Sequence, residues 1–122
     1  MVSEQEVRDF LVTLPGVEVA SMYGQEAFKV KGKFLTRIRA AGESDSGALV
    51  LKVDFIERDA LMSMQPETFF PTPHYQNYRT VLVRLEHADR EQIEDLLTES
   101  WRQTAPKMMV REFDAARAEA SR

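Results

Sequence analysis

The stretch from Ala27 to Arg39, AFKVKGKFLTRIR, constrains the fold of this chain more than any other. Apolar and basic residues alternate on both sides of a glycine, a pattern that predicts a β-hairpin. Gly32 can adopt the positive φ angle that the last position of a three-residue hairpin loop requires. We therefore predict a turn at Val30-Lys31-Gly32. A two-residue loop at Lys31-Gly32 would place charged and apolar side chains together on both faces, and we reject it for that reason.

Because side chains alternate across a strand, this register gives the hairpin two unlike faces. It pairs Phe28 with Phe34 and Lys29 with Lys33. The face expected in the core carries Phe28, Phe34, Thr36 and Ile38. The face expected in solvent is basic, with Lys29, Lys33, Arg37 and Arg39, and it also holds Ala27 and Leu35.

Composition limits the classes of protein to which the chain can belong. At 122 residues with 43% hydrophobic and 30% charged residues, the chain is typical of one globular domain. We expect a single domain over residues 1–110 and a frayed helical tail over residues 111–122. No apolar run approaches the ~20 residues that span a bilayer, and the polar, acidic N-terminus is unlike a secretory signal. The absence of cysteine excludes disulfide and thiolate chemistry and fits a cytoplasmic location.

Three helices are predicted from apolar spacing and capping residues. The first begins after Ser3, which has capping-box spacing to Glu6. The second covers Glu57 to Met64, with Asp54 as its cap. The third begins after Asp89. The side chains expected to be buried on the first helix are Val7, Phe10, Leu11 and Leu14. Those on the second are Ile56, Ala60, Leu61 and Met64. Those on the third are Ile93, Leu96, Leu97, Ser100, Trp101 and Thr104.

Strands are predicted over Ala48–Val53 and Thr80–Leu85 in addition to the hairpin, and 17–23 reads as an extended or first-strand segment. The two prolines in Phe69–Tyr78 favour an edge strand or an ordered loop, because proline cannot donate to a central ladder. The order of elements predicts an α+β two-layer sandwich, an antiparallel sheet with helices packed on one face.

Several short motifs in this order resemble the MmcQ/YjbR-like family. They are Leu14-Pro15-Gly16-Val17, the segment Phe28–Phe34, Leu51-Lys52-Val53, His74-Tyr75 before Val81–Leu85, and the helix Glu94–Trp101 followed by Ala105-Pro106-Lys107. The resemblance covers about residues 3–110. It implies a fold similar to the frataxin-like α+β sandwich. Proteins of this family are commonly described as DNA-binding, and the family has no catalytic motif to transfer.

Two groups of residues are candidates for binding. The basic sheet face, with Lys29, Lys33, Arg37, Arg39, Lys52 and Arg84, could neutralise the phosphates of DNA with low sequence specificity. His74, Tyr75 and Tyr78 could contact a small ligand or a protein partner, and Tyr75 or Tyr78 could stack on an unpaired base. The ordinary interpretations remain open, namely a solvated outer sheet face and aromatic residues that belong to the core.

No metal site, cofactor or catalytic centre is expected. The two histidines have no second ligand at metal-binding spacing, and no nucleophile has an evident base. We therefore predict a non-enzymatic binding protein with DNA as its candidate partner and no membrane segment. The alternative is an interaction module or homodimer that uses the aromatic 69–78 stretch, the methionines and the C-terminal tail.

Overall fold

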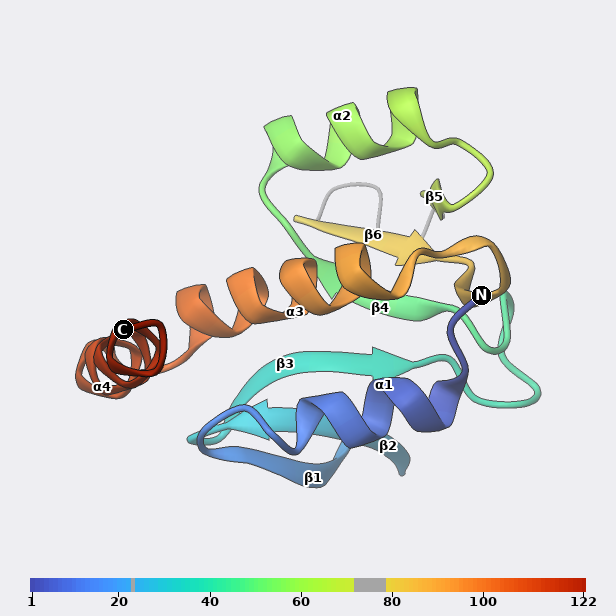
Figure 1. Cartoon of the computed structure of the whole chain (residues 1–122). Coiled ribbons are helices and arrows are strands. Elements are labelled where there is room, and N and C mark those ends of the chain that lie inside the picture. The colour runs from blue at the N-terminus through green and yellow to red at the C-terminus, as the bar shows by residue number, and fades with distance from the viewer. Residues whose placement is uncertain (23, 72–78) are drawn as a thin grey trace.

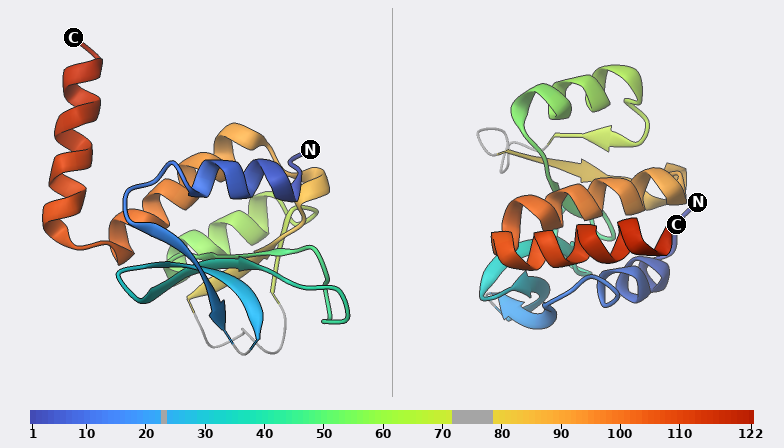
Figure 2. Two further views of the ribbon diagram at one scale, coloured as in Figure 1. Left: turned by 90° about the horizontal axis from the view of Figure 1, so that it is seen from below. Right: turned by 60° about the vertical axis from the view of Figure 1, so that its left-hand side comes forward.

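The computed structural model describes residues 1–22, 24–71 and 79–122 (Figure 1). Its antiparallel sheet has the strand order β1-β2-β3-β4-β6-β5. The strands are β1 (Val17–Met22), β2 (Gln25–Val30), β3 (Lys33–Ile38), β4 (Leu49–Lys52), β5 (Phe69–Phe70) and β6 (Thr80–Val83). The helices are α1 (Glu4–Leu11), α2 (Phe55–Met64), α3 (Arg90–Thr104) and α4 (Lys107–Ala120), with a short 3-10 helix at Leu85–His87. Helices α1 and α3 lie side by side over one face of the sheet, as Figure 2 shows, so the predicted α+β two-layer architecture is confirmed.

Helix α1 begins as its capping residues predict. The backbone amide of Glu6 donates to Oγ of Ser3 at 3.0 Å, and the backbone amide of Ser3 donates to the Glu6 carboxylate at 3.1 Å. These two bonds satisfy amides that have no partner inside the helix. Val7 and Leu11 on its apolar stripe are then fully buried against the sheet.

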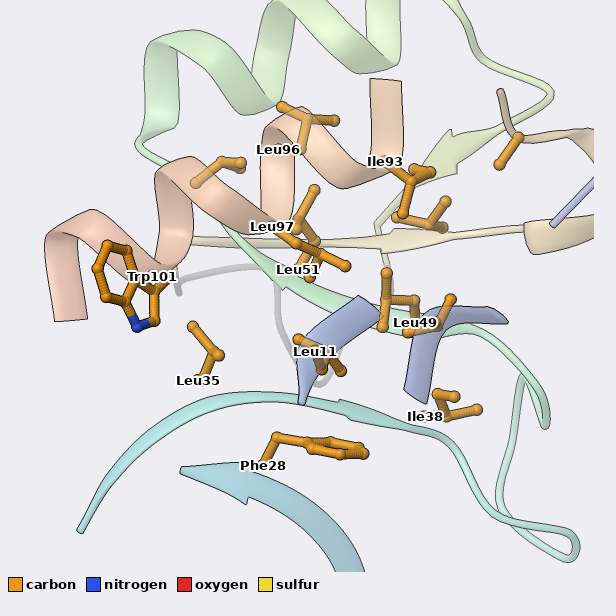
Figure 3. Packing of buried hydrophobic residues seen from close by; sticks show 14 of the residues in the cluster. Leu11, Phe28, Leu35, Ile38, Leu49, Leu51, Ile93, Leu96, Leu97 and Trp101 are labelled. Carbon is orange, nitrogen blue, oxygen red and sulfur yellow. The ribbon is translucent and has the colours of Figure 1, made fainter. Parts of the chain in front are cut away.

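Helix α3 carries most of the core, and its predicted stripe is confirmed in full. Ile93, Leu96, Leu97, Ser100, Trp101 and Thr104 are all buried. In Figure 3 these apolar side chains meet Leu49 and Leu51 of β4 and Leu35 of β3. Burying side chains of this size stabilises the fold by roughly 1.5–3 kcal/mol each.

The turn of the hairpin is not where the sequence analysis placed it. Val30 pairs with Lys33, so the loop has the two residues Lys31 and Gly32. Both have positive φ angles, 50° and 80°, as a type I′ turn requires. This turn type is common in two-residue hairpin loops because its twist matches that of the flanking strands. The two-residue loop was rejected on the assumption that side chains alternate without interruption along both strands. That assumption fails, because the register shifts between Phe28 and Lys29.

A β-bulge next to this turn separates apolar from charged side chains. The register shifts between Phe28, which pairs with Thr36, and Lys29, which pairs with Phe34. Phe28, Leu35 and Ile38 belong to the main core under the helices. The prediction that Phe34 lies in this core is wrong, since its ring packs on the opposite face in a small cluster with Ala48, Val50, Leu82 and Phe70.

Helix α2 is capped by Asp54 as expected, with the amide of Glu57 donating to its carboxylate at 2.8 Å. Its predicted buried side is wrong except at Leu61, which packs partly on the core together with Met62. Ile56 and Met64 are 85% and 79% exposed, and Ala60 is exposed as well. The helix lies against the short strand β5 and the strand β6 and does not reach under α3, so only a narrow side of it is covered.

Helix α4 continues to Ala120 through the residues for which a frayed tail was expected. Its first turns pack on the domain through Met109, Val110 and Phe113. From Asp114 onward every residue is exposed. No helix among the described residues is long and apolar enough to cross a membrane.

Candidate functional site

The six residues of the predicted basic face do not form one exposed surface. Arg37 pairs with Val50 and therefore lies on the outer face, as predicted, but it is only 7% exposed. Its Nη2 donates to Oε2 of Glu43 at 2.5 Å. The prediction that Arg37 is free to meet solvent or a ligand is wrong, because the polar loop after β3 folds back and covers it.

Arg39 is buried in the same way, at 8% exposure, so the prediction of an exposed Arg39 is also wrong. Its Nε donates to the backbone carbonyl of Ser44 at 2.9 Å, and its Nη2 donates to Oγ of Ser44 at 2.9 Å. The hydrogen bond from Arg37 holds the pKa of Glu43 below its ordinary value, despite an opposing effect of burial. The two arginines therefore serve to fix the 40–47 loop.

Arg84 lies at the other end of the sheet. Its guanidinium stacks over the ring of Phe70, 3.9 Å from the ring centre, and Nη1 donates to the carbonyl of Glu67 at 3.4 Å. This cation–π contact occupies one face of the guanidinium. Arg84 is thus a structural partner of β5 and does not join the other basic side chains.

Lysines gather instead at the end of the β2–β3 hairpin. Lys31 and Lys33 are exposed at the turn, and Lys29 is half-buried one pair further along β2. Lys33 pairs with Val30 of the inner face, whereas Lys29 pairs with Phe34 of the outer face. The turn therefore presents ammonium groups on both sides of the hairpin and at its tip.

Lys52 brings a fourth ammonium group to this end from β4. Its Nζ donates to the carbonyl of Phe34 at 2.8 Å and to Oγ1 of Thr104 in α3 at 3.0 Å. Ser100 in turn donates its hydroxyl to the backbone carbonyl of Lys52. Burial lowers the pKa of Lys52, and the nearby charge of Lys33 lowers it further. The two ammonium groups therefore repel each other.

No ion pair within the described residues involves a lysine, whereas Arg8, Arg37 and Arg90 each have a carboxylate partner. We call Lys29, Lys31, Lys33 and Lys52 the lysine end. Lys107, the remaining lysine, opens α4 three residues after Thr104, and Figures 1 and 2 place α4 at the same end of the molecule as the β2–β3 turn. Glu18 of β1 is the cross-strand partner of Lys29 but forms no ion pair with it. An end with several ammonium groups that lack an ion-pair partner among the described residues is suited to binding anions.

The other predicted site residues remain predictions. His74, Tyr75 and Tyr78 lie outside the described residues, which include Phe69 and Phe70 of the same stretch as a confirmed edge strand. In the described parts of the chain, no group of three or more His, Cys, Asp or Glu side chains is placed to hold a metal ion.

Sequence reasoning missed two features. Lys31 was assigned to the turn and was not included among the candidate binding residues. The sequence does contain a signal for it, because three of the five lysines fall within residues 29–33. The exposed apolar side of α2 had no such signal, because its spacing is that of any helix that packs on a core.

Comparison with known proteins agrees with this architecture. The model of the YjbR family matches residues 12–103, which is most of the chain. The chain belongs to the YjbR family. The resemblance proposed from sequence motifs is thereby confirmed.

Relatives of this YjbR-family chain include the uncharacterized proteins Rv2570 of Mycobacterium tuberculosis and Mb2600 of Mycobacterium bovis. Each is 40% identical over 77 residues, which are 62% of this chain and 60% of the relative. The crystal structure of Deinococcus radiodurans protein DR2400, described by its domain DUF419, is similar with a TM-score of 0.63 and 21% identity, covering 83% of this chain and 77% of that one. At this identity the similarity shows a shared fold.

Proposed function

We propose that this YjbR-family chain is a non-enzymatic binding protein that holds the phosphate backbone of DNA against its lysine end. The observation that carries the proposal is the set of four lysines, from two separate segments of the chain, with no ion pair among the described residues. A phosphate placed near Lys33 and Lys52 would relieve their mutual repulsion, because it supplies the counter-charge that the protein does not.

Lysine recognises phosphate as a point charge, with no geometry that selects a base. Binding at the lysine end should therefore be weak, dependent on salt and nearly independent of sequence. The surface differs from the sheet face predicted from sequence, because Arg37 and Arg39 are committed to the 40–47 loop.

The test compares two double variants that each remove two exposed positive charges. Lys31→Gln with Lys33→Gln changes the lysine end, and Arg117→Gln with Arg122→Gln changes the exposed C-terminal part of the chain. Affinity is measured by fluorescence anisotropy with labelled mixed-sequence DNA, single- and double-stranded, at low salt. We expect the lysine variant to bind at least about five-fold more weakly, and the arginine variant to resemble the unmodified protein. Equal losses in both variants, or no binding of the unmodified protein at low salt, would refute the lysine end as the site.

The alternative function, a protein-interaction module, is favoured by a separate observation. Helix α2 exposes a row of apolar side chains, and none of them belongs to the lysine end.

A further inference from the structure

Helix α2 presents an apolar groove to solvent. Ile56, Ala60 and Met64 follow one another at four-residue spacing, so they lie along one side of the helix. The groove along them has a volume of about 410 Å³ and is bounded by Asp54 and Glu57 at the start of the helix. Leu61, at the base of the groove, and Met62 pack on the core and anchor the helix, whereas Ile56, Ala60 and Met64 are exposed.

Two large apolar side chains that are 85% and 79% exposed on one short helix are unusual in a chain that stays alone. Their spacing is the spacing that helices use to pack on other helices. A helix would fit this groove if it carried small and apolar side chains, with positive charge near the end that Asp54 and Glu57 border.

Helix α4 projects from the domain in Figure 2, and one exposed side of it carries Met108 and Ala115 together with the charged residues Arg111 and Glu112. Met109, Val110 and Phe113 hold one side of α4 against the domain. Met108, which is 65% exposed, and Ala115 lie seven residues apart on another side of the helix. All of α4 lies beyond residues 12–103, the part matched by the family model.

We propose that the α2 groove receives α4 from a second copy of this chain, in a two-fold dimer with two reciprocal α2–α4 contacts. Met108 and Ala115 enter the groove beside Ile56 and Met64. The ten residues of α2 and the fourteen of α4 correspond to lengths of roughly 15 Å and 21 Å, so α4 is long enough to cover the groove. Reciprocal contacts of this kind close the assembly at two copies.

Charge complementarity supports a second copy as the occupant. The groove is bordered by the carboxylates of Asp54 and Glu57, whereas Lys107 and Arg111 lie together on one side of Met108 on α4, with Glu112 on its other side. The α4 of the same chain does not fill the groove, because Figures 1 and 2 show α4 at the far end of α3, away from α2. Opposite charges at the border of an apolar contact select the partner and its orientation.

The first test is the mass of the full chain by sedimentation equilibrium over a concentration series. We expect a dimer that dissociates on dilution. Ile56→Glu and Met64→Glu should each yield folded monomers, because both side chains are exposed. Their melting temperature should equal that of the unmodified protein at dilutions where the unmodified protein is also monomeric. The matched control is Val19→Glu, which places the same charge at a 59% exposed valine on the edge strand β1 and should remain dimeric.

The second test exchanges the charges across the contact. Glu57→Arg and Arg111→Glu should each weaken the dimer at least about five-fold at low salt, and the double variant should recover most of the affinity. The proposal is overturned by a monomeric unmodified protein at roughly millimolar concentration, where even weak dimers form. Dissociation by Val19→Glu, growth into open polymers, or a double variant weaker than both single variants would overturn it as well.

Discussion

At the scale of single residues, the β-bulge in the hairpin decides which of two neighbouring side chains, Phe34 or Leu35, enters the core. The alternation rule assigns Phe34 to the side of Phe28, but the register shift turns Leu35 inward and leaves Phe34 on the other face. Leu35 is fully buried, whereas Phe34 is only partly covered.

Truncating the two side chains should therefore have effects opposite to those that the uninterrupted register implies. Leu35→Ala should lower the free energy of unfolding by about 2–5 kcal/mol, the range for a buried leucine. Phe34→Ala should cost less, about 1–2 kcal/mol, since part of its ring is already in water. Urea denaturation followed by tryptophan fluorescence measures both values. A larger loss for Phe34→Ala would show that the bulge is absent.

The ion pair between Arg37 and Glu43 predicts a dependence of stability on pH. The pKa of Glu43 is lower in the folded protein than in the unfolded chain, chiefly because Arg37 donates to its carboxylate. A carboxyl group of this kind contributes stability above its unfolded pKa and loses that contribution as the pH falls through its folded pKa.

Unmodified protein should thus exceed Glu43→Gln in stability by about 1–2 kcal/mol at neutral pH, and the difference should vanish in acid. Melting temperatures of the two proteins, recorded between roughly pH 7 and pH 3, test this expectation. A difference that stays constant across the series would contradict a stabilising role for the charge of Glu43.

At the scale of elements, the docking of α4 depends on contacts that join three distant parts of the chain. The indole Nε1 of Trp101 donates to the carbonyl of Pro15 at 2.8 Å, and the ring of Phe113 lies 4.7 Å from that of Trp101. Met109 approaches Gly16 so closely that a side-chain carbon there would lie 2.8 Å from its methyl group. Glycine at this position, with a φ angle of 72°, thus permits both the turn and the contact.

Removing the aromatic contact should release α4 from the domain. Phe113→Ala is expected to expose one side of Trp101, the only tryptophan, and to shift its fluorescence emission to longer wavelength. Amide exchange in α4 should become faster, because an isolated helix of fourteen residues is marginal in water. Phe55→Ala, which truncates an exposed aromatic ring on α2, is the control and should leave the emission unchanged. An unshifted Phe113→Ala spectrum would show that α4 is held by other contacts.

At the scale of the whole molecule, net charge and local charge oppose each other. The chain carries a formal charge of −4 at pH 7, which repels DNA at long range, whereas the proposed site at the lysine end would attract phosphate at short range. If all four lysines contact phosphates, the logarithm of the affinity for double-stranded DNA should fall with a slope of roughly −3 to −4 against the logarithm of salt concentration. Lys31→Gln with Lys33→Gln should reduce the steepness by about two. A flat salt dependence would favour an apolar ligand over DNA.

The substitutions that test the two proposals change different residues, so each proposal can be tested by itself. Ile56→Glu addresses the dimer and leaves the lysine end unchanged. Lys31→Gln with Lys33→Gln addresses DNA and leaves both α2 and α4 intact. A monomeric variant that still binds DNA would separate the two properties directly.

The amino-acid sequence by itself determined the features that depend on near neighbours along the chain. The capping box of Ser3 and Glu6, the caps Asp54 and Asp89, and the buried stripe of α3 follow from hydrogen-bond reach and helical period, which involve residues three or four apart. The same local rules, with the family motifs, were enough for the α+β architecture.

Only the tertiary structure decided which side chains meet across long separations. It buried Arg37 and Arg39 under a returning loop, exposed Ile56 and Met64, and brought Lys52 beside the β2–β3 turn. Burial depends on what else packs at the same place, and a one-residue bulge reverses the facing of every residue beyond it. For this reason the identity of the basic residues was evident from the sequence, but their availability to a ligand was not.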